Sequence, residues 1–225
     1  WNQGFEETER LLAEGRWQPA LERADALAAE MTHQIVTGDG AAALLGKVSR
    51  LRALAYAGLG AKREALWDWA VARQLAPELE GDPLDGYGEA GRLLKAGQAD
   101  PLLLLRDGAG DAKPACENVT PPRKVRAPDP EFPEAQRGHP ERPPVQLIVQ
   151  TILDRQGVPQ SPRILKMTGE PVFVLASLAA LREWRFEPAR CKGEPVETYY
   201  NLALNFSTEK EERGRRRRGG RRSGG

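Results

Sequence analysis

The sequence predicts an α + (α+β) chain, in which a helical module precedes a smaller domain of mixed helix and strand. Between Trp1 and Lys95, apolar residues recur at helical spacing, and alanine and leucine dominate. Half of the 18 prolines then fall between Pro114 and Pro144, and strand-like alternation begins at Val145. We therefore predict a helical domain at 1–97, a proline-rich linker at 98–127, an α+β domain at 128–206 and a disordered Arg/Gly-rich tail at 207–225.

Five helices are expected in the first module, because glycines and prolines interrupt its apolar periodicity. Gly15, the loop Val36–Gly40 and Pro77 mark the interruptions. The expected helices are Gly4–Gly15, Gln18–His33, Ala41–Gly58, Arg63–Leu75 and a short one at Tyr87–Leu94.

The third and fourth of these helices follow the order of small and large residues in a tetratricopeptide repeat. Small side chains let two helices approach closely, Tyr56 and Trp69 fill the space between them, and Gly60 permits the turn. A weaker copy places Gly15 at an earlier turn. An ordinary helical bundle is the alternative, and under both interpretations Tyr56 and Trp69 are structural. The residues in repeat order are Ala53, Tyr56, Gly60, Ala65, Trp69, Ala72 and Pro77.

The second domain is expected to contain three strands and one helix. Val145–Leu153 alternates as a strand, and a turn with a glycine leads into a second strand at Val158–Met167. Pro171–Trp184 is an amphipathic helix, and Val196–Phe206 alternates again as a long third strand. Since prolines cannot donate to a ladder, the second strand belongs at a sheet edge.

The β-β-α-β order and its residues resemble the C-terminal domain of the TonB family of energy transducers. This resemblance implies a three-stranded antiparallel sheet and covers about a third of the chain. The matching segments are Phe132–Ala135, Leu153–Gly157, Ala176–Leu178, Trp184–Ala189, Gly193–Val196 and Asn205–Phe206.

Three of the matching residues can be given a structural role without reference to the TonB family. Trp184 and Phe186 stand two residues apart at the transition from helix to strand, so both can seal the helix onto the sheet. Pro188 then ends the element. We expect these residues to serve the fold.

The resemblance implies that the chain works by strand addition. In TonB proteins the C-terminal domain captures an extended segment of an outer-membrane receptor. Residues 196–206 contain no proline, so their free edge can accept another strand through backbone hydrogen bonds. The side chains expected to contact such a partner are Glu197, Tyr199, Asn201, Ala203 and Asn205.

Two alternatives remain open at this stage. The linker or a second copy of the chain could cover this edge instead. The chain could also be a scaffold subunit of a larger membrane-associated complex, using both modules for docking. Either way we expect a periplasmic, non-enzymatic protein with protein partners, and because the chain begins at Trp1 we expect a signal or anchor upstream.

The chain has only two cysteines and two histidines, so few residues are candidates for nucleophilic catalysis or metal binding. We expect no cofactor and no metal site. In an oxidising periplasm Cys116 and Cys191 would pair in a disulfide that pins the linker to the second domain, whereas in a reducing compartment both would be free thiols.

The formal net charge of +1 hides an uneven distribution. Residues 1–111 carry a net charge of −6, residues 112–206 carry +2 and residues 207–225 carry +5. The basic tail is expected to contact anionic lipid or an acidic partner, with a solvated extension as the alternative. Nucleic acid is a weaker expectation, because no aromatic residue interleaves with the tail arginines Arg215, Arg216, Arg217 and Arg218.

Overall fold

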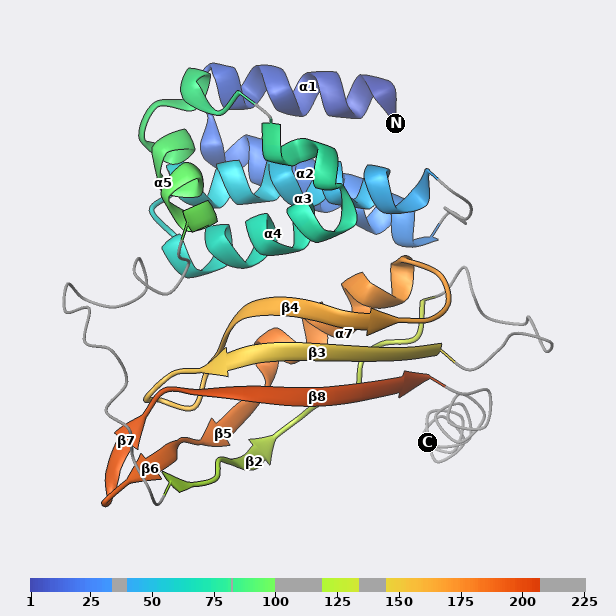
Figure 1. Cartoon of the computed structure of the whole chain (residues 1–225). Coiled ribbons are helices and arrows are strands. Elements are labelled where there is room, and N and C mark those ends of the chain that lie inside the picture. The colour runs from blue at the N-terminus through green and yellow to red at the C-terminus, as the bar shows by residue number, and fades with distance from the viewer. Residues whose placement is uncertain (34–39, 82, 100–118, 134–144, 207–225) are drawn as a thin grey trace, which may run out of the picture.

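A computed structural model of the chain describes residues 1–33, 40–81, 83–99, 119–133 and 145–206. The helices gather in one layer, and a three-stranded sheet with one helix lies against them (Figure 1). The two parts correspond to the predicted helical module and α+β domain, so the predicted fold class is confirmed.

The helical module contains the five expected helices, and the fifth is longer than predicted. Two short 3₁₀ turns, Pro77–Gly81 and Asp85–Tyr87, lie before the last helix. None of the helices described is long and apolar enough to cross a membrane. The helices are α1 (Asn2–Ala13), α2 (Trp17–His33), α3 (Ala41–Gly58), α4 (Lys62–Leu75) and α5 (Gly88–Ala99).

Two of these helices end in the same glycine turn. Gly15 and Gly60 have φ angles of +71° and +76°, which glycine adopts without a steric penalty. The next amide N–H donates back into the helix, from Arg16 to the Leu11 carbonyl and from Ala61 to the Tyr56 carbonyl, both at 2.9 Å. The repeated turn is compatible with tetratricopeptide-like hairpins, and that assignment stays a prediction.

The sheet of the second domain is antiparallel, with strand order β4-β3-β8. Its strands are β3 (Val145–Leu153), β4 (Pro159–Met167) and β8 (Thr198–Phe206), and α7 (Val172–Glu183) covers one face. The proline-bearing strand β4 therefore lies at an edge, as predicted. The third strand begins later than predicted, since Glu197 separates β8 from the short strand β7 (Glu194–Val196).

Further short strands were not predicted, and two of them correct the expected linker at 98–127. Strands β1 (Val119–Thr120) and β2 (Arg123–Arg126) pair with β6 (Ala189–Cys191) and β5 (Arg185–Glu187). Their residues are all exposed, so the sequence shows no apolar alternation that would predict these strands.

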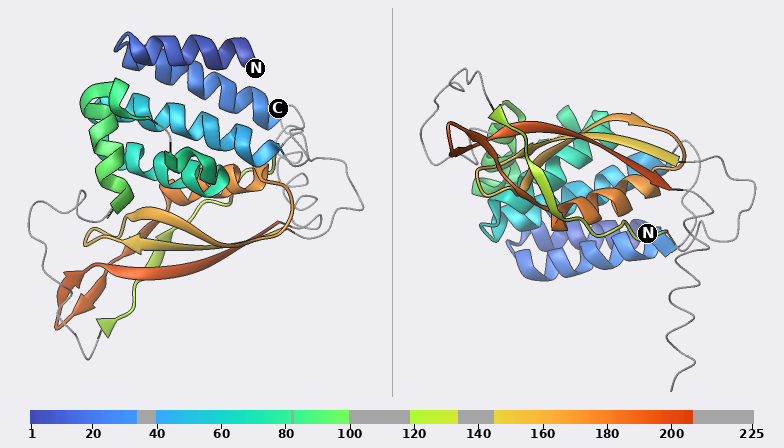
Figure 2. Two further views of the ribbon diagram at one scale, coloured as in Figure 1. Left: turned by 45° about the horizontal axis from the view of Figure 1, so that its top comes forward. Right: turned by 90° about the horizontal axis from the view of Figure 1, so that it is seen from below.

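The hydrophobic core crosses the boundary between the two modules. One buried cluster combines Met31, Trp67 and Val71 of the helical module with Val149 and other residues of the sheet and α7. A second cluster, centred on Trp69, belongs to the helical module alone. The left view of Figure 2 shows the helices beside the sheet and α7, and α4 contacts β4. The modules therefore share one packed interface.

Candidate functional site

The outer edge of β8 is the longest regular strand edge that the described residues present. Nine residues of β8 pair with β3 without a bulge, from Val145 opposite Phe206 to Leu153 opposite Thr198. No strand among the described residues pairs with the other side of β8. In Figure 1 this strand lies at the side of the sheet farthest from the helical module.

The ladder defines which backbone groups face this open edge. The N–H and C=O of Gln146 point toward β4, because Thr168 N–H donates to the Gln146 carbonyl at 2.9 Å and Gln146 N–H donates to the Thr168 hydroxyl. The odd-numbered residues of β3 therefore bond to β8, which uses its even-numbered residues for that purpose. The odd-numbered residues of β8 present their backbone groups to the open edge.

The predicted partner-binding residues coincide with these odd-numbered positions. Tyr199, Asn201, Ala203 and Asn205 are exposed on one face of β8, while the even-numbered Leu202, Leu204 and Phe206 are buried against the core. Glu197 is half-buried and precedes the strand. The structure thus brings four of the five predicted residues together on the open strand.

A ladder of side-chain amides stiffens this face. Gln150 Nε2 donates to Asn201 Oδ1 at 3.2 Å, and Gln146 Nε2 donates to Asn205 Oδ1 at 3.4 Å. Each pair joins residues that stand directly opposite each other on β3 and β8. The exposed side of β8 is therefore polar and held in place.

The opposite edge of the sheet, β4, is irregular. Its register with β3 shifts twice, and Ser161 in the second shift has a φ of +45°, a conformation that few residues other than glycine adopt. Pro159 and Pro162 lack an N–H. Another strand could not pair with β4 along its length.

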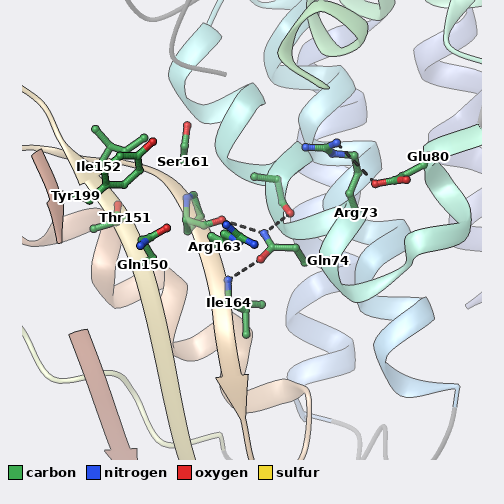
Figure 3. Close-up of a pocket in the computed structure, with 12 residues that line it drawn as sticks. Arg73, Gln74, Glu80, Gln150, Thr151, Ile152, Ser161, Arg163, Ile164 and Tyr199 are labelled. Carbon is green, nitrogen blue, oxygen red and sulfur yellow. Dashed lines mark hydrogen bonds and ion pairs between the residues drawn. The ribbon is translucent and has the colours of Figure 1, made fainter. Parts of the chain in front are cut away.

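A glutamine of the helical module forms hydrogen bonds with backbone groups that β4 directs outward. The side chain of Gln74, on α4, donates from Nε2 to the Pro162 carbonyl at 2.9 Å and accepts from Ile164 N–H at 2.5 Å (Figure 3). A side-chain amide here replaces the backbone amide of an adjacent strand. The helical module therefore closes β4 within the same chain.

An ionic network joins the modules beside this clamp. Asp68 of α4 is buried and accepts a hydrogen bond from Arg182 of α7, and Arg52 Nε lies 3.4 Å from its second oxygen. Burial raises the pKa of the Asp68 carboxyl, although the charges of Arg182 and Arg52 oppose the shift. The Arg182 guanidinium also lies 5.4 Å from the centre of the Trp67 ring.

A cleft of about 500 Å³ opens between α4 and the exposed face of the sheet. Figure 3 shows Arg73, Glu80 and Gln74 on the helical side, facing residues of β4, β3 and β8. Tyr199, the first exposed residue of β8, reaches the cleft from the open edge. The cleft and the open edge are therefore neighbours.

The residues predicted to be structural take buried or packed positions. Trp184 and Phe186 are each 4% exposed, their rings lie 6.2 Å apart, and the indole N–H of Trp184 donates to the Pro128 carbonyl at 2.9 Å. Pro188 is half-buried between β5 and β6. Trp69 is buried in the helical core, and Tyr56 is half-buried against it.

Cys191 lies in β6, and it is not a free cysteine. Cys116 falls outside the described residues, so the predicted disulfide stays a prediction. The tail arginines Arg215, Arg216, Arg217 and Arg218 also lie outside the described residues. Within the part of the chain that is described, no cluster of three His, Cys, Asp or Glu residues could hold a metal ion.

Sequence reasoning missed the residues that join the modules. Gln74, Asp68 and Arg182 occur on ordinary amphipathic helices, and no motif distinguishes them from solvent-exposed polar residues. Asp68 stands between Trp67 and Trp69, and a carboxylate between two aromatic residues was the one available signal of burial. Their partners lie more than 85 residues away in sequence, so only the folded chain reveals them.

Comparison with known protein families finds a match in the second domain. Residues 130–208 match the family model of the Gram-negative bacterial TonB protein C-terminal domain. Domains of this family are non-enzymatic and mediate protein interactions in the periplasm during outer-membrane transport. No match was found among curated proteins. The resemblance predicted from the sequence is confirmed, and the chain carries a TonB family C-terminal domain at residues 130–208.

Proposed function

We propose that the chain binds an extended segment of an outer-membrane receptor by strand addition at β8 and thereby couples to outer-membrane transport. The observation that supports this most directly is the open edge itself. It offers nine regular residues without a proline, while β4 is closed by Gln74. The family match supports a receptor as the partner.

The backbone of β8 would supply most of the affinity. Asn201, Ala203 and Asn205 direct their N–H and C=O groups toward the incoming strand, and each new backbone hydrogen bond contributes a net stabilisation of about 0.5–1.5 kcal/mol. Their exposed side chains would adjust specificity, because side chains of neighbouring strands on one face contact each other. A partner segment without proline fits such an edge.

The experiment uses overlapping synthetic peptides that cover the periplasmic segments of outer-membrane receptors from the same bacterium. Binding is measured by fluorescence anisotropy on the full chain. Asn201→Pro removes one outward N–H without removing a bond to β3, so peptide binding should be lost while the far-ultraviolet spectrum is unchanged.

Asn201→Ala is the matched control, because it keeps the N–H and removes only the amide side chain. We expect it to retain most of the binding. Leu204→Pro, which removes an N–H bonded to β3, should instead unfold the sheet. A peptide set in which nothing binds, or binding that survives Asn201→Pro, would contradict the proposal.

A second candidate is a scaffold subunit of a larger membrane-associated complex. The shared core favours it, because a helical module that is packed rigidly on the second domain can present two docking surfaces at a fixed distance. Native gel electrophoresis of detergent-solubilised membranes tests it. Migration in a large complex, together with failure of all receptor peptides to bind, would favour the scaffold over the receptor partner.

We also propose that Cys116 and Cys191 form a disulfide. Val119 stands opposite Cys191 in the β1–β6 pair, which brings the chain just after Cys116 to β6. Cross-linking a loop of this length stabilises a fold by about 4 kcal/mol in the chain-entropy estimate. Alkylation of the denatured protein with and without reductant tests the bond: two labels that appear only after reduction support it, and labelling without reductant contradicts it.

A further inference from the structure

The cleft beside β8 combines residues from both modules, so neither module alone would form it. Arg73 and Gln74 come from α4, Glu80 from the 3₁₀ turn that follows, and Ser161 and Arg163 from β4. Figure 3 shows the two sets facing each other across the opening. A cleft built at a junction of this kind is a common place for a ligand.

The polar groups of the cleft include more spare donors than acceptors. Arg163 is exposed, and no carboxylate of the described residues lies within ion-pair distance of it. Arg73 Nη1 lies 3.9 Å from Glu80, and Arg73 Nε is buried without a hydrogen-bond partner. The buried Ser161 hydroxyl also lacks a partner. Two guanidinium groups against one carboxylate fit an anionic group, because arginine pairs well with carboxylates.

The cleft also lies within reach of a strand bound to β8. Tyr199 of β8 and Ile152 of β3 line its end nearest the open edge, and Arg163 lies two strands away on β4. A bound strand lies one spacing beyond β8, so three spacings, about 14 Å, separate it from β4, and about four or five extended residues can span that distance. A segment that leaves the β8 edge at Tyr199 could therefore cross the sheet and enter the cleft.

We propose that this cleft binds an acidic side chain of the same partner segment, about four or five residues beyond the residue that stands opposite Tyr199. This inference rests on the proposed strand addition at β8. The helical module then contributes to partner specificity through Arg73, and the sheet contributes through Arg163. The chain would prefer segments in which a proline-free strand is flanked by Asp or Glu at one end.

The test uses the receptor peptides that bind, each made in a second form with its flanking acidic residue changed to Gln or Asn. Affinity for the acidic form should exceed that for the amide form by about threefold to fivefold, as for a partly exposed ion pair. The Arg163→Gln variant should remove this difference. Lys166→Gln is the matched control, because Lys166 is exposed on the same strand and does not line the cleft.

The outcomes separate the two proposals. If Arg163→Gln leaves the preference for the acidic form unchanged while Asn201→Pro abolishes binding, the cleft inference is wrong and strand addition stands. If the binding peptides carry no acidic flank, or Lys166→Gln has the same effect as Arg163→Gln, the cleft inference is also wrong. If binding survives Asn201→Pro, the proposed function fails and this inference fails with it.

Discussion

The two edges of the small sheet differ in regularity, in proline content and in what packs on them. Edge strand β4 has two prolines, two register shifts and a residue of positive φ, and α4 packs on it. Edge strand β8 has nine regular residues and no proline, and it lies away from the helical module (Figure 1). One edge is closed in two independent ways, and the other has neither protection.

The β4 edge shows that proline alone does not close an edge to strand pairing. Pro162 has no N–H, but its carbonyl and the N–H of Ile164 still face outward. Gln74 satisfies both groups at once, which requires the helical module to be docked in a fixed position. The closed edge is therefore a property of the whole chain, and separating the modules should reopen it.

The largest expected effect comes from breaking the shared core. Trp67→Ala should destabilise the chain by about 3–5 kcal/mol, because a buried tryptophan leaves a cavity. Trp67 packs in the cluster shared with the sheet, so amide exchange should accelerate at Ile164 of β4 as well as in α4. Chemical denaturation and hydrogen exchange measure both effects.

The neighbouring tryptophan gives the matched control. Trp69 is equally buried but belongs to the cluster of the helical module alone. Trp69→Ala should cost a similar amount, yet leave protection of β4 unchanged at matched stability. Equal acceleration of β4 exchange in both variants would show that the modules do not depend on the Trp67 contact.

The buried ionic network should give the next largest effect. Asp68→Asn leaves the Arg182 and Arg52 guanidinium groups without their charged partner, and we expect a loss of about 1–3 kcal/mol. Asp25→Asn is the control, because Asp25 also pairs with Arg52, at 3.0 Å, but is half exposed. Its loss should stay below about 1 kcal/mol. Equal losses by denaturation would contradict a special role for the buried carboxylate.

The parts of the fold that are local in sequence could be predicted. Periodicity marked the helices, alternation marked β3 and β8, and Pro159 and Pro162 placed β4 at an edge. The short strands β1 and β2 could not be found, because all their residues are exposed and their partners lie about 60 to 70 residues away. Tertiary pairing alone creates them.

Some residues of the candidate site could likewise be predicted from the sequence, and others could not. The odd-numbered residues from Tyr199 to Asn205 follow from strand alternation and the absence of proline. The clamp at Gln74 and the cleft with Arg73 and Arg163 require knowledge of how two distant segments pack. Helical amphipathicity distinguishes the buried from the exposed face of α4, but it does not say which protein surface covers the buried face.

A smaller effect is expected from the clamp itself. Gln74→Ala leaves the Ile164 N–H and the Pro162 carbonyl without partners, which should cost about 1–2 kcal/mol and accelerate exchange at Ile164. Gln74→Glu can still accept from Ile164 but cannot donate to Pro162, so its effect on Ile164 should be smaller. If exchange at Ile164 is unchanged in Gln74→Ala, the clamp does not protect β4.

The smallest expected effect concerns β2, which stays with β5 and away from β8. Arg123 donates two hydrogen bonds to Glu187, at 2.5 and 2.9 Å, and these bonds hold the pKa of the Glu187 carboxyl below its usual value. Because the pKa of Glu187 is lower in the folded chain, the Arg123–Glu187 pair stabilises the fold at pH values above 4.5, the pKa in the unfolded chain. This stabilisation is lost as the pH falls through the pKa of Glu187 in the folded chain. Acid should therefore loosen β2.

Measurements of amide exchange, corrected for its intrinsic pH dependence, test this prediction on each strand separately. Protection of β2 should fall in that acid range, while protection of β8, which is held by β3 alone, should not. Glu187→Gln should show the loosened β2 already at neutral pH and no further acid response. If acid loosens β2 and β8 together, β2 and the open edge are coupled, and β8 is not the independent edge that strand addition requires.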